Sequence, residues 1–168
     1  MGFLSDLPLG DLAGSHVSAR IPVSRALLNG LVAEALAGRR IPVRSVDIQP
    51  RAGDRFDAVV TMSWPLVPAL TVSFVVERQP SFPASPQLVL RYSFLGAIGA
   101  FASHLVGAFD RLPDGVRLDA DRLLLDIPAL AAGSPPAMMM RYVKALELHT
   151  LDDRAVIDLE LAIPEASS

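Results

Sequence analysis

The chain has 168 residues, of which 51% are hydrophobic and 20% charged, and its formal net charge is −3 at pH 7. This length fits one domain that buries about two-thirds of its unfolded surface. The composition argues against disorder, and the acidic balance argues against a nucleic-acid partner. The absence of cysteine excludes disulfides, thiolate catalysis and cysteine-based zinc sites.

The N-terminal segment MGFLSDLPLGDLAGSH has neither the basic nor the apolar region of a signal peptide. As written, the sequence therefore predicts a cytoplasmic protein, and an envelope location is the alternative if a leader has been removed. We expect a single domain over residues 1–168. Residues 1–15 are expected to be irregular, and residues 16–164 to form an α+β domain.

The first regular elements are expected to be a short strand and a helix. Residues 16–23 alternate between polar and apolar side chains, which is typical of a strand. Ser24 can cap the following segment, RALLNGLVAEALAG, in which leucine, valine and alanine recur at helical spacing. Gly38 is expected to end this amphipathic helix.

Most of the remaining chain alternates with a period of two residues, which predicts about eight strands. Residues 116–127 are expected to form one strand with a bend. Asp152-Asp153 is expected to be the turn of a C-terminal hairpin. The other predicted strands cover residues 43–49, 56–64, 70–76 and 88–94, and the hairpin strands cover 143–150 and 155–163.

Residues 94–109, FLGAIGAFASHLVGAF, carry no formal charge. The segment is shorter than the roughly 20 residues that span a bilayer, so it predicts a helix that the strands cover. Gly99, Ser103 and Gly107 form a row of small residues that either accommodates another element or leaves room for a ligand or partner chain. We therefore expect an α+β fold in which a highly curved antiparallel sheet wraps around this long apolar helix.

No catalytic signature is present, because the sequence has no phosphate-binding glycine loop, GxSxG or HExxH. His149 is expected to pair with Asp152 or Asp153 as a hairpin salt bridge. Asp119 and Asp121 form a DxD, which could hold a divalent cation but is better explained as a solvated strand face beside arginines. We expect no enzymatic activity, no catalytic or metal-binding residues and no cofactor.

Two loops are unusually apolar, Trp64–Pro68 and Pro135–Met140. In a simple meander both would fall at the end of the sheet where the apolar helix begins. They could form an apolar entrance for a lipid or a docking partner. Alternatively, the methionine run begins the next strand and packs in the core.

Four segments resemble the TULIP (tubular lipid-binding) superfamily, over about residues 17–163. ARIPVSRALLNGLVAEAL resembles the opening strand and helix, and IPVRSVDIQPRAGDRFDAVVTMSW resembles the following meander. LPDGVRLDADRLLLDIPAL and VKALELHTLDDRAVIDLELAIP resemble the closing strands. The resemblance implies a curved sheet around a long helix, with a lipid-holding groove between them. Two features depart from the family pattern. The lipoprotein cysteine of many bacterial relatives is missing, and the chain is short.

The first functional hypothesis is non-enzymatic binding of a lipid, a fatty-acyl chain or another apolar ligand in that groove. The residues expected to line it are Leu31, Trp64, Phe74, Leu90, Ile98, Phe101, Leu105, Phe109 and Met139. The alternative is a protein-assembly module that buries the same surface in a homodimer or against a partner. A third hypothesis is an enzyme on a helix-grip or hotdog-like shell that needs His104 or Asp119. No transmembrane segment is expected, although peripheral membrane contact is compatible with either of the first two.

Overall fold

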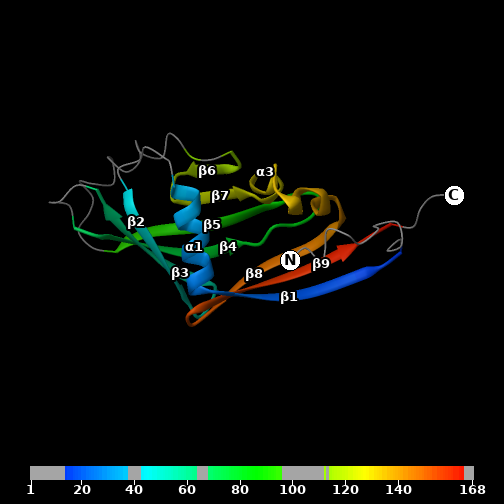
Figure 1. Ribbon diagram of the computed structural model, residues 1–168, viewed down its shortest axis with the longest axis horizontal. Helices are drawn as coiled ribbons and strands as arrows, with labels where there is room; N and C mark the ends of the chain where they lie inside the picture. Colours follow the sequence, from blue (N-terminus) through cyan, green and yellow to red (C-terminus); the bar gives the residue numbers. More distant parts are fainter. Residues whose placement is uncertain (1–13, 38–42, 64–67, 96–111, 113, 165–168) are drawn as a thin grey trace.

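The computed structural model describes residues 14–37, 43–63, 68–95, 112 and 114–164, and the statements below concern these residues. Within them, nine strands form two antiparallel sheets (Figure 1). The three-stranded sheet has the order β1-β9-β8, and the six-stranded sheet has the order β2-β3-β4-β5-β7-β6. Three short helical elements accompany them.

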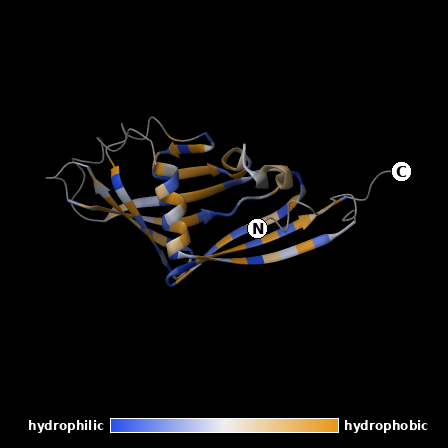
Figure 2. Ribbon diagram, viewed as in Figure 1, coloured by the Kyte–Doolittle hydropathy of each residue, from blue (hydrophilic) through white to orange (hydrophobic). Residues whose placement is uncertain are grey.

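The three-stranded sheet contains β1 (His16–Ser24), β8 (Val143–Leu151) and β9 (Arg154–Ala162). The predicted hairpin is confirmed, because Asp152 and Asp153 join β8 to β9 and Asp153 has a φ of 65°. Residues directly opposite one another share a face. One face of this sheet is therefore apolar. It begins with Val17, Leu161 and Val143 and continues through the pairs further along the strands. The alternating hydropathy is visible in Figure 2.

The six-stranded sheet has one almost wholly apolar face. Its strands are β2 (Val43–Arg51), β3 (Arg55–Met62), β4 (Leu70–Arg78), β5 (Gln87–Leu95), β6 (Val116–Asp119) and β7 (Arg122–Asp126). The registers place Ala58, Val72 and Phe94 in one row of this face. Another row contains Val76, Leu90, Leu123 and Leu118. The period-two pattern thus predicted the strands and their inward side correctly.

The prediction of one bent strand over residues 116–127 is wrong, because β6 and β7 form a hairpin. Asp119 lies opposite Arg122, and the turn between them places Ala120 at a φ of 52°. Alanine rarely adopts this left-handed conformation, so the sequence shows no typical turn signal there. The Tyr92 hydroxyl donates a hydrogen bond of 2.7 Å to the Ala120 carbonyl, and this contact holds the turn against β5.

The predicted first helix is confirmed as α1 (Arg25–Leu36), and the Ser24 hydroxyl caps it by accepting from Leu27 N–H. α1 lies mainly against the edge strand β2. The Asn29 side-chain amide both donates to and accepts from the Ile48 backbone, at 3.1 and 2.6 Å. It thereby replaces a neighbouring strand at this edge. Leu27 and Leu31 remain about half exposed, so α1 leaves part of its apolar stripe uncovered.

Between β7 and β8 the chain forms two helical elements that the sequence did not predict. Asp126 caps α3 (Ile127–Ala131) by accepting from Ala129 N–H. The methionine run lies in the 3-10 helix η3 (Pro135–Tyr142), so it does not begin β8. Met138 is 68% exposed, whereas Met139 is half-buried.

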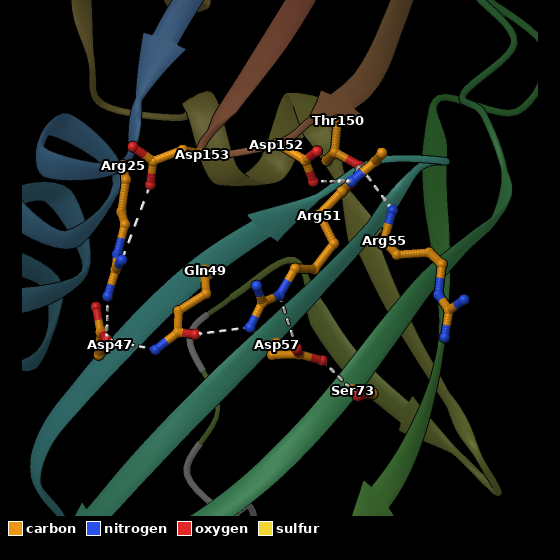
Figure 3. Close-up of polar contacts among 11 residues, drawn as sticks. Arg25, Asp47, Gln49, Arg51, Arg55, Asp57, Ser73, Thr150, Asp152 and Asp153 are labelled. Atoms are coloured by element: carbon orange, nitrogen blue, oxygen red, sulfur yellow. Dashed lines mark hydrogen bonds and ion pairs between the residues drawn. The ribbon is translucent and has the colours of Figure 1, made fainter.

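The two sheets meet where the β2–β3 turn contacts the β8–β9 hairpin (Figure 3). Thr150 is 3% exposed and lies at the centre of this junction. Its hydroxyl accepts from Arg55 N–H and donates to the Arg51 carbonyl, both at 2.6 Å. The Asp54 carboxylate accepts from Thr150 N–H. This polar junction joins the sheets into one structure.

The segment just after β4 meets β8 on the far side of the junction. The Gln79 side-chain amide donates to the Leu148 carbonyl at 2.7 Å and accepts from Leu148 N–H at 3.0 Å. Ser81 forms an antiparallel bridge with Ala145. β8 therefore lies beside the segment that continues β4 past the start of β3.

The described residues are mostly antiparallel strand with few helices, which agrees with the predicted α+β class. The predicted helix over residues 94–109 lies largely outside the described residues. Its first two residues belong instead to β5, which ends at Leu95.

Candidate functional site

A row of aromatic rings crosses the apolar face of the six-stranded sheet. Phe56 lies opposite Phe74 on β3 and β4, and their rings stack with centroids 5.3 Å apart. Phe74 lies opposite Tyr92 on β5, at 6.2 Å. Tyr92 meets Phe94 edge to face at 5.7 Å. We call these four residues the aromatic row.

The aromatic row is less enclosed than several aliphatic residues of the same face, although Val60, Val76 and Leu123 there are half-buried as well. Its four members are half-buried, whereas Leu70, Leu88 and Leu90 on the same sheet are at most 4% exposed. Aromatic rings present a large apolar area together with a weakly polar face, which suits contact with an apolar ligand. The row is therefore the best candidate for a ligand-contacting surface on this face.

The structure brings two of the predicted site residues together and separates two others. Phe74 belongs to the aromatic row, and Leu90 follows on the same face of β5, opposite Val76. Leu31 lies on α1 and is 54% exposed. Met139 lies in η3, beyond the end of β7.

The other five predicted site residues lie outside the described residues, as does His104. They are Trp64, Ile98, Phe101, Leu105 and Phe109. Their contribution to a binding site stays a prediction from the sequence.

The strand ends argue against a shared apolar entrance formed by the two apolar loops. β3 ends at Met62 and β4 begins at Leu70, on the side of the sheet where β5 ends. α3 and η3 follow Asp126, which lies opposite Gln87 at the start of β5. The flanks of the two loops are thus at opposite ends of the six-stranded sheet. The simple meander fails because β6 starts beside the beginning of β5.

The opposite face of this sheet is mixed: it carries ion pairs and polar residues, but Val59, Val75, Val89 and Leu124 also lie on it, and Val89 is 4% exposed. Arg25 donates to Asp47 at 2.7 Å and holds the pKa of that carboxyl below its usual value. Arg122 likewise lowers the pKa of Glu77 through hydrogen bonds. Carboxylates stabilised in the charged form suit ion pairs better than proton transfer at neutral pH. The ion-paired residues of this face therefore form a solvated structural surface.

A small hollow lies on this polar face, beside the start of α3. Its lining residues are Gln87, Gly115, Arg117, Leu124, Asp126 and Ala129. Its volume of about 100 Å³ is well below the roughly 300 Å³ of a typical small-molecule pocket. Gly115 has a φ of +87°, and a Cβ there would come within 2.8 Å of the Ala129 Cβ. The hollow is thus a close-packed joint rather than a ligand site.

His149 is the histidine that the structure places in a charged cluster. Its Nδ1 lies 3.3 Å from the Asp54 carboxylate across the junction, and its Nε2 lies 3.2 Å from Glu147. The prediction that His149 pairs with Asp152 or Asp153 is therefore wrong. The hydrogen bond to Glu147, followed by that to Asp54, raises the pKa of His149 above its ordinary value.

We expect the stability of the protein to fall slightly as pH rises through the folded-state pKa of His149. The stabilisation is complete below the unfolded pKa of about 6.5 and is lost above the raised value. Because the ring is partly exposed, the change should be only about 0.5 kcal/mol. Urea unfolding at pH 5.5 and 8.5 measures it. His149→Gln should remove the difference, whereas His16→Gln on exposed β1 should keep it; equal slopes for both variants would contradict this origin.

The DxD is split by the β6–β7 turn, because Asp119 ends β6 and Asp121 lies in the turn. Arg122 faces Asp119 and bonds to Glu77. No group of three or more potential metal ligands occurs among the described residues. In the same part of the chain, no helix is long and apolar enough to cross a membrane.

Neither a protein-family model, nor a curated protein, nor a solved structure matches this chain. The functional argument therefore depends on the residues alone. The strands predicted from the sequence contain Phe56, Tyr92 and Phe94, but these residues were not among the predicted site residues. The missing signal was the strand pairing, which places Phe56 and Tyr92 opposite Phe74 and brings Phe94, opposite Val72, next to Tyr92.

Proposed function

We propose that the protein binds a lipid or another apolar ligand on the apolar face of the six-stranded sheet, without catalysing a reaction. The observation that carries the proposal is the half-buried aromatic row on a face that is otherwise aliphatic. A domain that needed only a filled core would gain more from burying these rings fully.

The topology supports the expected helix as the second wall of this site. β5 and β6 run in the same direction with β7 between them, so the chain after Leu95 must return to the other end of the sheet before Val116. From Leu88 to Leu95 the sheet measures seven residue steps, or about 23 Å. The 14 residues of the charge-free segment that follow β5, 96–109, would measure about 21 Å as a helix. The charge-free segment has the length and the apolarity for this crossing.

The described helices leave this face in need of such a cover. Leu88 and Leu90 on β5 are nearly fully buried. α1 does not account for this burial, because it lies mainly against β2. A helix crossing the face, with small residues on one side, would leave space beside the aromatic row for an acyl chain. This arrangement is the one that the TULIP resemblance implies.

Native mass spectrometry of the purified chain tests the proposal. We expect additional mass from a co-purified lipid, its removal by organic extraction, and the uptake of one oleic acid per chain afterwards. The polar face of the same sheet offers no comparable surface, so binding should saturate at one site. A chain that carries no lipid and takes up no oleic acid after extraction, while remaining folded by circular dichroism, would overturn the proposal.

A further inference from the structure

Four arginines form a row across the six-stranded sheet, on the face opposite the aromatic row. The registers place Arg51 on β2 opposite Arg55 on β3, and Arg55 opposite Val75 on β4. Val75 lies opposite Arg91 on β5, and Arg91 lies opposite Arg122 on β7. All four arginines are exposed. We call Arg51, Arg55, Arg91 and Arg122 the arginine row.

The arginine row sets arginine directly opposite arginine twice, and like charges in this position destabilise a sheet. One member of each pair is neutralised within the chain. Arg51 lies 3.1 Å from the Asp57 carboxylate, and Arg122 lies 2.8 Å from that of Glu77. The other member of each pair stays a cation beside an arginine.

These two remaining cations are Arg55 and Arg91. Neither forms an ion pair with another residue in the part of the chain that the structure describes. Figure 3 shows the guanidinium of Arg55 lying apart from Asp57. The hydrogen bond from Arg122 and, to a smaller extent, the charge of Arg91 lower the pKa of Glu77. The two acids beside the row are therefore already engaged by other arginines.

Arg55 and Arg91 flank Val75, one on each neighbouring strand. Strands in a sheet are about 4.8 Å apart, so the Cα atoms of the two arginines are separated by about 10 Å. Two long side chains that start at this distance can both reach an ion above Val75, which is half-buried and uncharged. A guanidinium binds an oxyanion through two parallel N–H groups. Phosphate has enough oxygens to accept from two guanidinium groups at once, whereas a carboxylate is satisfied by one.

We propose that Arg55 and Arg91 bind a phosphate group above Val75, with one guanidinium on each side. The bound anion would offset the repulsion that each arginine meets from its neighbour in the row. Asp57 and Glu77 lie beside this site and confine the attraction to a single group, which disfavours an extended polyanion such as a nucleic acid. The phosphate belongs either to a small soluble molecule or to a phospholipid headgroup.

Titration with inorganic phosphate, followed by NMR of the arginine side chains, tests the site. We expect saturable shifts of the Arg55 and Arg91 resonances. Losing a hydrogen bond to a charged group should reduce the affinity at least about tenfold, so Arg55→Gln and Arg91→Gln should each weaken phosphate binding by that factor. In chloride, both variants should be no less stable than the wild type, because each removes a like-charged neighbour.

The matched control is the double variant Lys144→Gln with Arg154→Gln. It removes two positive charges, as Arg55→Gln with Arg91→Gln does, but from exposed positions on the three-stranded sheet. The control should keep the phosphate affinity of the wild type. Equal phosphate affinity for the two double variants would overturn the proposal. So would a loss of stability in chloride that is confined to Arg55→Gln with Arg91→Gln, because the row would then have a structural role.

Vesicle flotation distinguishes the two sources of the phosphate. If the group is a headgroup, vesicles containing phosphatidic acid should carry the wild type but not the Arg55→Gln, Arg91→Gln variant, and pure phosphatidylcholine vesicles should carry neither. Saturable binding of inorganic phosphate without flotation would assign the site to a soluble phosphate compound. The proposed lipid site lies on the opposite face of the sheet, so oleic acid uptake should be unchanged in this variant. Either proposal can therefore fail without the other.

Discussion

Replacing Thr150 by valine should lower the free energy of unfolding by about 2 kcal/mol. Valine keeps the shape of threonine but lacks the hydroxyl that accepts from Arg55 N–H and donates to the Arg51 carbonyl. Because Thr150 is 3% exposed, water cannot readily replace it there. Denaturant unfolding should show the loss, and the melting temperature should fall by about 4–8 °C.

Two further threonine variants separate the hydroxyl from the methyl group. Thr150→Ser keeps both hydrogen bonds and loses one methyl, so it should cost about 1 kcal/mol. Thr71→Val changes a half-buried threonine on the polar face of β4 and should stay within about 0.5 kcal/mol of the wild type. If Thr150→Val were as stable as Thr71→Val, the hydroxyl would not hold the two sheets together.

The strands were predictable because each has one apolar side. Phe56, Phe74 and Tyr92 fall on the correct faces from the period-two pattern alone. The hairpin at Asp152-Asp153 carries typical turn residues and was also predicted. The turn at Ala120 was missed because alanine gives no such signal, although its φ is 52°.

The junction could not be predicted because its partners are far apart in sequence. Thr150 meets Arg51 and Arg55 across about a hundred residues, and His149 meets Asp54 across a similar separation. No local pattern identifies such pairs. The same reason hid the aromatic row, whose members lie on three strands and are aligned only by the register.

The course of the chain between β5 and β6 is the point at which sequence and topology support each other. Composition predicted a covered apolar helix over residues 94–109, of which the first two belong to β5. The strand order independently requires a connection that returns along the sheet, since β6 starts beside Leu88. The helix itself stays a prediction from the sequence, and the topology adds only that the described ends of β5 and β6 lie at opposite ends of the sheet.

Phe74→Ala should weaken the binding of a fatty acid by about tenfold, which corresponds to about 1.4 kcal/mol. Phe74 stacks on Phe56 and contacts Tyr92, so its removal opens the middle of the aromatic row. Displacement of a fluorescent fatty acid from the delipidated chain measures the change. Phe74→Leu keeps most of the apolar volume and should bind within about threefold of the wild type.

The matched control for this prediction is Ser93→Ala. Ser93 lies on β5 between Tyr92 and Phe94 but points to the opposite, polar face. It should leave fatty-acid affinity unchanged if the ligand lies on the apolar face. Thermal unfolding of each variant shows whether a loss of binding follows a loss of folding, because truncating a phenylalanine also lowers stability. A folded Phe74→Ala variant with wild-type affinity would remove the aromatic row from the binding site, because Phe74 is the ring that contacts both Phe56 and Tyr92.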